Sequence, residues 1–150
     1  MLEDLKDIEK RNENILILGD LNRGIGAGDL GVEGNKPQVS YGGQLLRDLL
    51  ATNKYVLLNK LPMAKGGVWT WVDRSNPETR SCLDLGIVSA GLAPFVQEFQ
   101  VDSEKVFTPR RVRRTKKGMV STYTDHFKLC LVASQGLESG QRKPVKICQH

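Results

Sequence analysis

Several short apolar segments follow one another after residue 54, and this succession constrains the fold more than any other feature. Residues 55–58, 68–72, 83–88, 95–101 and 126–132 each have the length of a strand, and the last two alternate with a period of two. No helical pattern separates them, whereas a doubly wound fold needs a helix between consecutive strands. We therefore expect an α+β fold with few helices and a mostly antiparallel or mixed sheet.

The first third of the chain has a different pattern. Residues 15–18 form a continuous apolar run that predicts a buried strand, and leucines recurring over residues 44–53 predict a helix. A short helix is expected over residues 2–12. Residues 20–43 are rich in glycine and predict a long loop. Long loops inside compact domains are typically functional.

The composition limits the classes of protein that need to be considered. A chain of 150 residues, 39% of them hydrophobic, fits one domain with a real core. No apolar run is long enough to span a membrane, and the acidic, amphipathic N-terminus is unlike a signal peptide. Three cysteines without a C-x-x-C pair indicate neither a disulfide framework nor a zinc site. We expect a reducing, intracellular location, nuclear or cytoplasmic.

The glycine-rich loop contains a G-x-G-x-x-G pattern at residues 26–31, which in nucleotide-binding proteins precedes a helix. Here the pattern is followed by another glycine and a proline, with no apolar period. The pyrophosphate of a dinucleotide binds at the exposed N–H groups of a helix N-terminus, which this loop lacks. A dinucleotide site is therefore disfavoured, and the absence of G-K-[ST] excludes a P-loop.

Acidic residues and a histidine lie at the ends of the predicted strands. Asp20 and Asn22 follow the first strand at spacing i, i+2, so they either cap it as an Asx turn or direct a base and an amide at one substrate atom. Asp84 is a lone acid in an apolar strand, where an unpaired carboxylate is costly. His126, beside Asp125, is the only internal histidine, either a core residue or the partner of Asp84. We expect Asp84 and His126 to lie within hydrogen-bond reach.

Four short motifs occur in a characteristic order: GDLN, TW, CLDLGIV and TDHF. In this order they resemble the second half of the endonuclease/exonuclease/phosphatase (DNase I-like) superfamily. The TW and RSCLD spacing and the basic run TPRRVRRTKKG look most like the endonuclease domains of non-LTR retrotransposons. The resemblance implies metal-dependent hydrolysis of phosphodiesters, with Mg²⁺ (Mn²⁺ as a substitute) as cofactor and DNA as substrate. A phosphoinositide phosphatase is a further option in the same class.

The resemblance assigns roles to individual residues. It implies that Asp20 is a general base or leaving-group acid, that Asn22 orients the phosphate, and that Asp84 pairs with a catalytic His126. Asp125 would lie at the metal. Thr124 stands where the family usually has serine, and Leu85 where it usually has an aromatic residue.

The resemblance covers residues 14–133, so we expect residues 1–133 to be the C-terminal half of such a domain and residues 134–150 to be a flexible tail. The expected fold is a partial DNase I-like sandwich, mostly one sheet with an open apolar face. A missing N-terminal half or another covering partner is therefore expected. The alternative function is a non-catalytic remnant that binds nucleic acid or a partner.

Basic residues are expected at a nucleic-acid interface in two places. A run before Asp125 is interpreted as a phosphate-binding segment, as a nuclear localisation signal or as a solvated loop. A polar hairpin over residues 73–81 resembles the variable loop that some retrotransposon endonucleases insert beside the cut. The residues concerned are Arg74, Arg80, Arg110, Arg111, Arg113, Arg114, Lys116 and Lys117. Trp69 and Trp71 are expected in the core rather than against bases.

Overall fold

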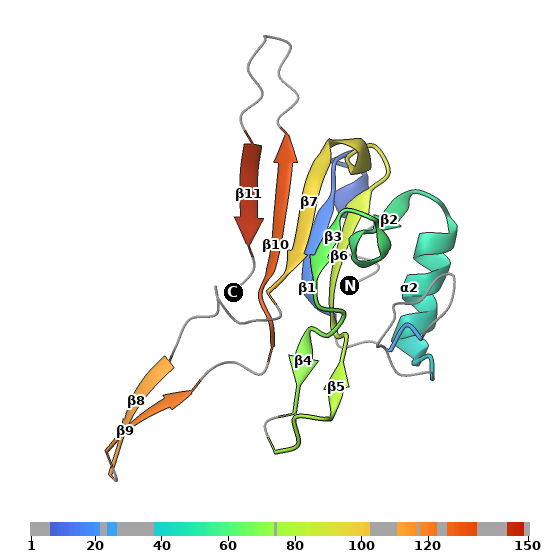
Figure 1. Ribbon diagram of the computed structural model, residues 1–150. Coiled ribbons are helices and arrows are strands. Elements are labelled where there is room, and N and C mark those ends of the chain that lie inside the picture. The colour runs from blue at the N-terminus through green and yellow to red at the C-terminus, as the bar shows by residue number, and fades with distance from the viewer. Residues whose placement is uncertain are drawn as a thin grey trace.

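The computed structural model describes residues 7–21, 24–26, 38–73, 75–102, 111–116, 118–122, 126–134 and 144–148 (Figure 1). The fold is α+β, rich in strands and with few helices, as the sequence predicts. In chain order the elements are β1 (Leu16–Asp20), α2 (Tyr41–Ala51), β2 (Tyr55–Leu57), the 3-10 turn η1 (Leu58–Lys60), β3 (Ala64–Gly66), β4 (Trp71–Val72), β5 (Arg80–Ser81), β6 (Asp84–Ser89), the 3-10 turn η2 (Ala93–Phe95), β7 (Val96–Val101), β8 (Arg111–Thr115), β9 (Gly118–Thr122), β10 (Leu129–Ser134) and β11 (Pro144–Cys148).

Three antiparallel strands in the order β1-β6-β2 form one sheet, which we call sheet A. Its central strand β6 is buried along its whole length, which fits the apolar residues Leu85, Ile87 and Val88 in its middle. Strand β1 pairs with β6 from Leu16↔Val88 to Asp20↔Asp84. Residues that face each other in such a pair project from the same side of the sheet.

Four strands in the order β11-β10-β7-β3 form sheet B, in which only β3 runs parallel to its neighbour. The edge strand β3 has the sequence AKG and little apolar surface of its own. Gly66 in this strand has φ of 92°, and a methyl group there would lie 1.9 Å from the carbonyl oxygen of Val101. Glycine is therefore needed for β3 to approach β7.

Sheets A and B pack face to face, and α2 covers the other face of sheet A (Figure 1). The core between the sheets joins Val88 of β6 to Phe99 of β7 and to Leu129 and Leu131 of β10. Phe99 lies over Gly86, where a methyl group would come 2.5 Å from the ring. The core on the helix side contains Leu46, Leu50, Leu85 and Ile87. Strand β6 therefore contributes alternate residues to two cores.

Helix α2 begins at a capped N-terminus that also anchors the glycine-rich loop. The hydroxyl of Ser40 accepts a hydrogen bond from the Gly43 N–H at 3.0 Å, and the Ser40 N–H donates to the Gly24 carbonyl at 2.9 Å. Ile25 is fully buried in the core under this helix. Among the described helices none is long and apolar enough to cross a lipid bilayer.

Two features of the fold differ from the sequence prediction. Seven of the described strands divide between two packed sheets rather than forming mostly one, while β4–β5 and β8–β9 form separate two-stranded ribbons. Both faces of sheet A are covered by described elements. The expectation of an open apolar face is therefore wrong for sheet A. The sequence indicates which segments are strands, but it does not indicate in which of the two sheets each strand pairs.

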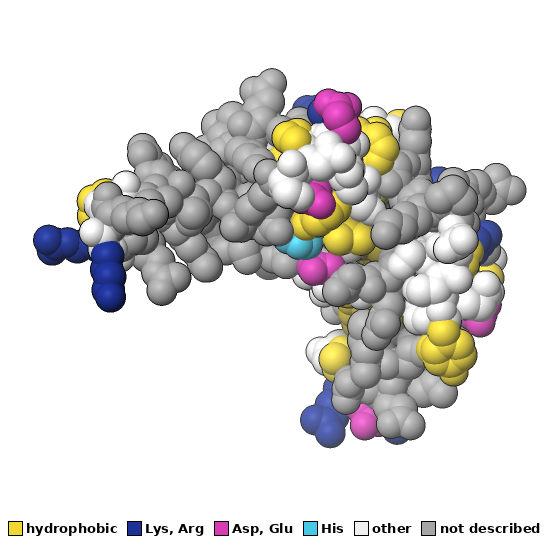
Figure 2. All heavy atoms as spheres, turned by 90° about the horizontal axis from the view of Figure 1, so that it is seen from below, with side chains coloured by type: hydrophobic (Ala, Val, Ile, Leu, Met, Phe, Trp, Pro, Cys, Tyr) yellow, Lys and Arg dark blue, Asp and Glu magenta, His cyan; other side chains and the backbone are white. Residues whose placement is uncertain are grey.

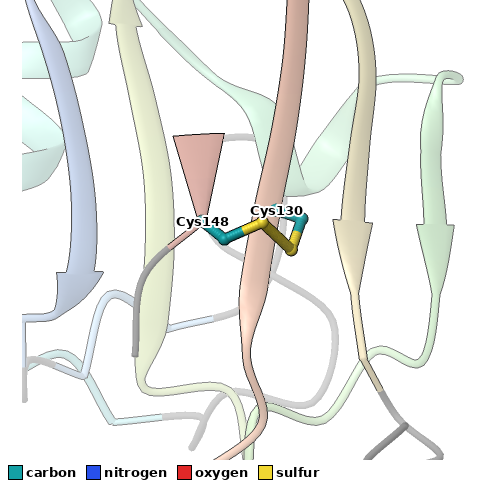
Figure 3. Close-up of a disulfide and its surroundings, with 2 residues drawn as sticks. All are labelled: Cys130 and Cys148. Carbon is teal, nitrogen blue, oxygen red and sulfur yellow. A yellow bond between two sulfur atoms is a disulfide. The ribbon is translucent and has the colours of Figure 1, made fainter. Parts of the chain in front are cut away.

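The C-terminal segment also differs from the predicted tail. Residues 144–148 form β11, which pairs with β10, and Cys130 and Cys148 face each other in this pair with Cα atoms 4.2 Å apart. They form a disulfide (Figure 3), although the cysteine count indicated no disulfide framework. No spacing motif marks this bridge, because it depends on the strand register. The third cysteine, Cys82, is buried and reduced.

Candidate active site

The carboxylates of Asp20 and Asp84 lie together at one end of sheet A. The two residues are directly paired across β1 and β6 and project from the face that packs on sheet B. Asp84 is buried, with 3% of its surface exposed, whereas Asp20 is exposed. Two like charges at facing positions repel each other, so this arrangement favours a proton donor or a cation between them.

His126 supplies that group. Its Nδ1 lies 2.8 Å from Oδ2 of Asp84, and its Nε2 lies 3.8 Å from Oδ2 of Asp20. The first distance is a hydrogen bond, and the second is too long for one. An ionised carboxylate only accepts hydrogen bonds, so Nδ1 carries the hydrogen and the lone pair of the neutral ring is on Nε2, on the side of Asp20. The predicted pairing of Asp84 with His126 is confirmed.

The backbone holds His126 beside the segment that enters β4. His126 forms an isolated antiparallel bridge with Trp71, and the Phe127 N–H donates to the carbonyl of Thr70 at 2.7 Å. The side chain of His126 keeps 29% of its surface exposed. The ring is therefore fixed at Nδ1 and accessible from solvent.

Thr70 links the two strands that carry the histidine and its partner. It is fully buried, and its hydroxyl oxygen accepts hydrogen bonds from the backbone N–H groups of Leu83 and Asp84, each at 2.8 Å. Its carbonyl binds the residue that follows His126. One threonine thus fixes the start of β6 and the segment before β10 relative to each other. Thr70 is the threonine of the TW motif, but nothing in the sequence indicated that it would bind the backbone of β6.

Asn59 supports Asp84 from the other side of β6. Its amide nitrogen donates to the Asp84 carbonyl at 3.2 Å, and its amide oxygen accepts from the Gly86 N–H at 2.8 Å. Both contacts are to backbone, so Asn59 continues the hydrogen bonding of β6 where β2 has ended. Nothing in the sequence indicated this role.

The surroundings make the two carboxyl groups chemically different. Burial raises the pKa of Asp84 above the ordinary value of a carboxyl group, and the nearby Asp20 raises it further. The hydrogen bond and charge of His126 lower this pKa, as does a hydrogen bond with Thr70. Asp84 thus serves as a buried partner for the ring, while the carboxylate of Asp20 faces solvent.

The described residues do not by themselves build a site for a divalent cation. In the part of the chain that the structure describes, no group of three or more acidic, cysteine or histidine side chains is arranged to hold a metal. The Asp84 carboxylate is bonded to His126, which leaves Asp20 as the exposed carboxylate of the site. Mg²⁺ usually needs one or two carboxylates together with substrate oxygens. Asp125, which the resemblance assigns to the metal, lies outside the described residues.

The other predicted site residues are only partly within the described chain. Asn22, Arg74, Arg110 and Lys117 lie outside it, and Arg111 and Arg113 lie in β8 without described side chains. Arg80 is exposed on the β4–β5 hairpin, and its Nε donates to the Pro77 carbonyl at 2.9 Å. Arg114 and Lys116 are exposed on the β8–β9 hairpin. The structure therefore brings together Asp20, Asp84 and His126 and leaves the described arginines outside this cluster.

No protein family, curated protein or solved structure matches the chain.

Proposed function

We propose that the chain hydrolyses phosphodiester bonds, with DNA as the substrate, through a site formed by Asp20, Asp84 and His126. The observation that carries the proposal is the hydrogen bond of 2.8 Å between His126 and the buried Asp84, with Asp20 3.8 Å from the other ring nitrogen. A carboxylate that holds an imidazole by Nδ1 fixes its tautomer and stabilises its protonated form. The resemblance to the endonuclease/exonuclease/phosphatase superfamily supports the choice of reaction.

The mechanism assigns one task to each side chain. Asp84 orients His126 and stabilises the positive charge that the ring gains when it takes a proton at Nε2. Asp20 and Nε2 are separated by a gap that a water molecule can bridge, because it can donate one hydrogen bond to Nε2 and one to the Asp20 carboxylate. Nε2 of His126 takes the proton of the attacking water, which Asp20 holds by a second hydrogen bond, and the leaving oxygen receives a proton from a solvent water. Thr70 and Asn59 keep the start of β6 in place.

Mg²⁺ remains part of this proposal through Asp125 and, by the same resemblance, through carboxylates that the N-terminal half of such a domain would supply. When bound, it would stabilise the charge that develops on the phosphate oxygens. The described residues alone do not form its site, so none of the steps above depends on it. The strand β1 is an edge of sheet A among the described strands, where a further strand from a partner segment could pair.

The test is nicking of supercoiled plasmid DNA with Mg²⁺, by the chain alone and by the chain joined to a matching N-terminal half. We expect little or no nicking by the chain alone and clear nicking by the completed domain. In the completed domain, His126→Ala or Asp20→Ala should lower the rate by roughly 10² or more, the scale for loss of a positioned acid–base group. Asp48→Ala is the control, because it removes another exposed carboxylate, on α2.

The second candidate function is a non-catalytic remnant that binds nucleic acid. Its support is the lack of a complete metal site among the described residues. A completed domain that binds DNA but does not nick it would favour this alternative. Strong nicking by the chain alone, abolished by His126→Ala, would instead show that the chemistry is right and that no further half is needed.

A further inference from the structure

The basic run before His126 forms a two-stranded ribbon, β8–β9. Five antiparallel pairs join Arg111↔Thr122 to Thr115↔Gly118, and Gly118 has φ of 120°, a backbone conformation that glycine adopts readily. Figure 1 shows the ribbon projecting away from both sheets. Among the described elements, β8 and β9 pack mainly against each other.

The side chains of this ribbon that the structure describes are exposed to solvent. They include Arg114 and Met119, which face each other across the strand pair, and Lys116 in the turn. Met119 is 68% exposed. A hairpin that packs on a core shows apolar residues on one face, and an isolated two-stranded hairpin is only marginally stable in water. None of the described side chains of the ribbon belongs to either core.

The ribbon carries the net charge of the protein. The chain has 22 basic and 17 acidic residues, and residues 111–122 contain five basic residues and no acid. The rest of the chain thus has 17 basic and 17 acidic residues and is neutral. Figure 2 shows Lys and Arg side chains at the end of the projecting arm. Charge concentrated on one narrow projection is complementary to a groove in a polyanion rather than to a flat acidic surface.

We infer that the β8–β9 ribbon binds in the major groove of duplex DNA, an inference that deepens the proposed function by naming the form of its substrate. The major groove is about 12 Å wide and admits a two-stranded ribbon, whereas the minor groove, at about 6 Å, does not. Five residues of strand extend over about 17 Å, or about five base pairs. The walls of this groove carry phosphate oxygens, with which the guanidinium group of the exposed Arg114 can pair.

The ribbon also places bound DNA beside the candidate site. Thr122 ends β9 and His126 is four residues further along the chain. Four residues of extended chain cover at most about 14 Å, so the base of the ribbon lies within that distance of the His126 backbone. A duplex held by β8–β9 therefore has its adjacent phosphates close to Asp20 and His126.

The experiment measures binding of the full chain to a fluorescein-labelled 20-base-pair DNA duplex, in EDTA and from 50 to 200 mM NaCl. The test variant replaces Arg113, Arg114, Lys116 and Lys117 with Ser. We expect the slope of log affinity against log salt to flatten by about 0.9 for each phosphate that the variant no longer neutralises, and so by up to about 3.6. The control replaces Lys10, Arg11, Arg47 and Lys54 with Ser, which removes the same charge from the body and should leave the slope unchanged. A third variant, Arg113→Lys with Arg114→Lys, retains the charge and should retain the slope.

Two further ligands test the groove. An RNA duplex of the same sequence should bind roughly tenfold or more weakly, because the major groove of A-form RNA is deep and narrow. A single strand of the same DNA should also bind more weakly than the duplex. Equal slopes for the ribbon and body variants, or equal affinity for RNA duplex or single strand, would overturn the inference. Because binding is measured in EDTA and nicking with Mg²⁺, a failure of nicking with intact binding rejects only the proposed catalysis.

Discussion

Thr70 offers the sharpest test of how the candidate site is held together. Thr70→Val keeps the shape of the side chain but removes the hydroxyl that accepts hydrogen bonds from the N–H groups of Leu83 and Asp84. Thr70→Ser keeps the hydroxyl and removes one methyl group. The two variants therefore separate the hydrogen bonds of Thr70 from its packing.

The structure gives the expected magnitudes. A buried donor left without a partner costs about 1–3 kcal/mol, and the Asp84 N–H is buried whereas Leu83 is half-buried. Thr70→Val should therefore lower the free energy of unfolding by about 2–5 kcal/mol. Thr70→Ser should lower it by about 1 kcal/mol, the cost of one buried methyl group and the small cavity that it leaves. The Thr70→Val variant should thus be less stable than the Thr70→Ser variant, although valine is closer to threonine in volume.

Urea unfolding followed by circular dichroism measures both free energies. The control is Thr52, which is exposed after α2 and whose hydroxyl donates to the Leu49 carbonyl at 2.6 Å. Thr52→Val should cost about 1 kcal/mol or less, because solvent satisfies the groups that it releases. Equal free energies of unfolding for Thr70→Val and Thr70→Ser would refute the role assigned to the hydroxyl.

Two further predictions concern the edges of the fold. Cys148→Ser should lower the free energy of unfolding by about 3 kcal/mol, the loop-closure scale for a bridge that spans 18 residues, and dithiothreitol should have this effect on the wild type but not on the variant. Burial and the Glu9 carboxylate raise the pKa of Tyr55 to about 12, so its absorbance near 295 nm should titrate well above that of an exposed tyrosine. Because the folded pKa lies above the unfolded value of 10.0, this contribution to stability is fully present below pH 10 and is lost as the pH rises through about 12; Tyr55→Phe should abolish the change.

The sequence predicted the strands whose segments have a clear apolar pattern. Strands β2, β6 and β7 fall within two residues of their predicted bounds, because burial on a regular backbone selects continuous or alternating apolar residues. The pattern missed β3, β8, β9 and β11, which have charged residues, glycine or proline in place of an apolar period. Their positions follow from backbone pairing and turn geometry, which leave little trace in a hydrophobic pattern.

The site residues that could be predicted are those whose residue type is unusual for the segment in which they lie. Asp84 is an acid in a strand predicted to be buried, and His126 is the only internal histidine. Their pairing could therefore be predicted from the free-energy cost of burying an unpaired carboxylate. Thr70 and Asn59 are ordinary residues in their segments. Their roles arise from the position of Thr70 beside the start of β6 and from the turn after β2. Such roles require three-dimensional positions.

The shared face of Leu16, Leu18 and Asp20 limits how homologous chains can vary in length. The two leucines pack between the sheets and the aspartate faces His126, because all three have the same parity along β1. Inserting or deleting one residue within this strand would turn Asp20 toward α2 and Ile17 toward sheet B. The contact of Asp20 with His126 and the packing of the leucines between the sheets would then be lost together. The β4–β5 and β8–β9 hairpins lie outside this constraint. We expect length changes among relatives to accumulate in these hairpins, while β1 keeps a constant number of residues.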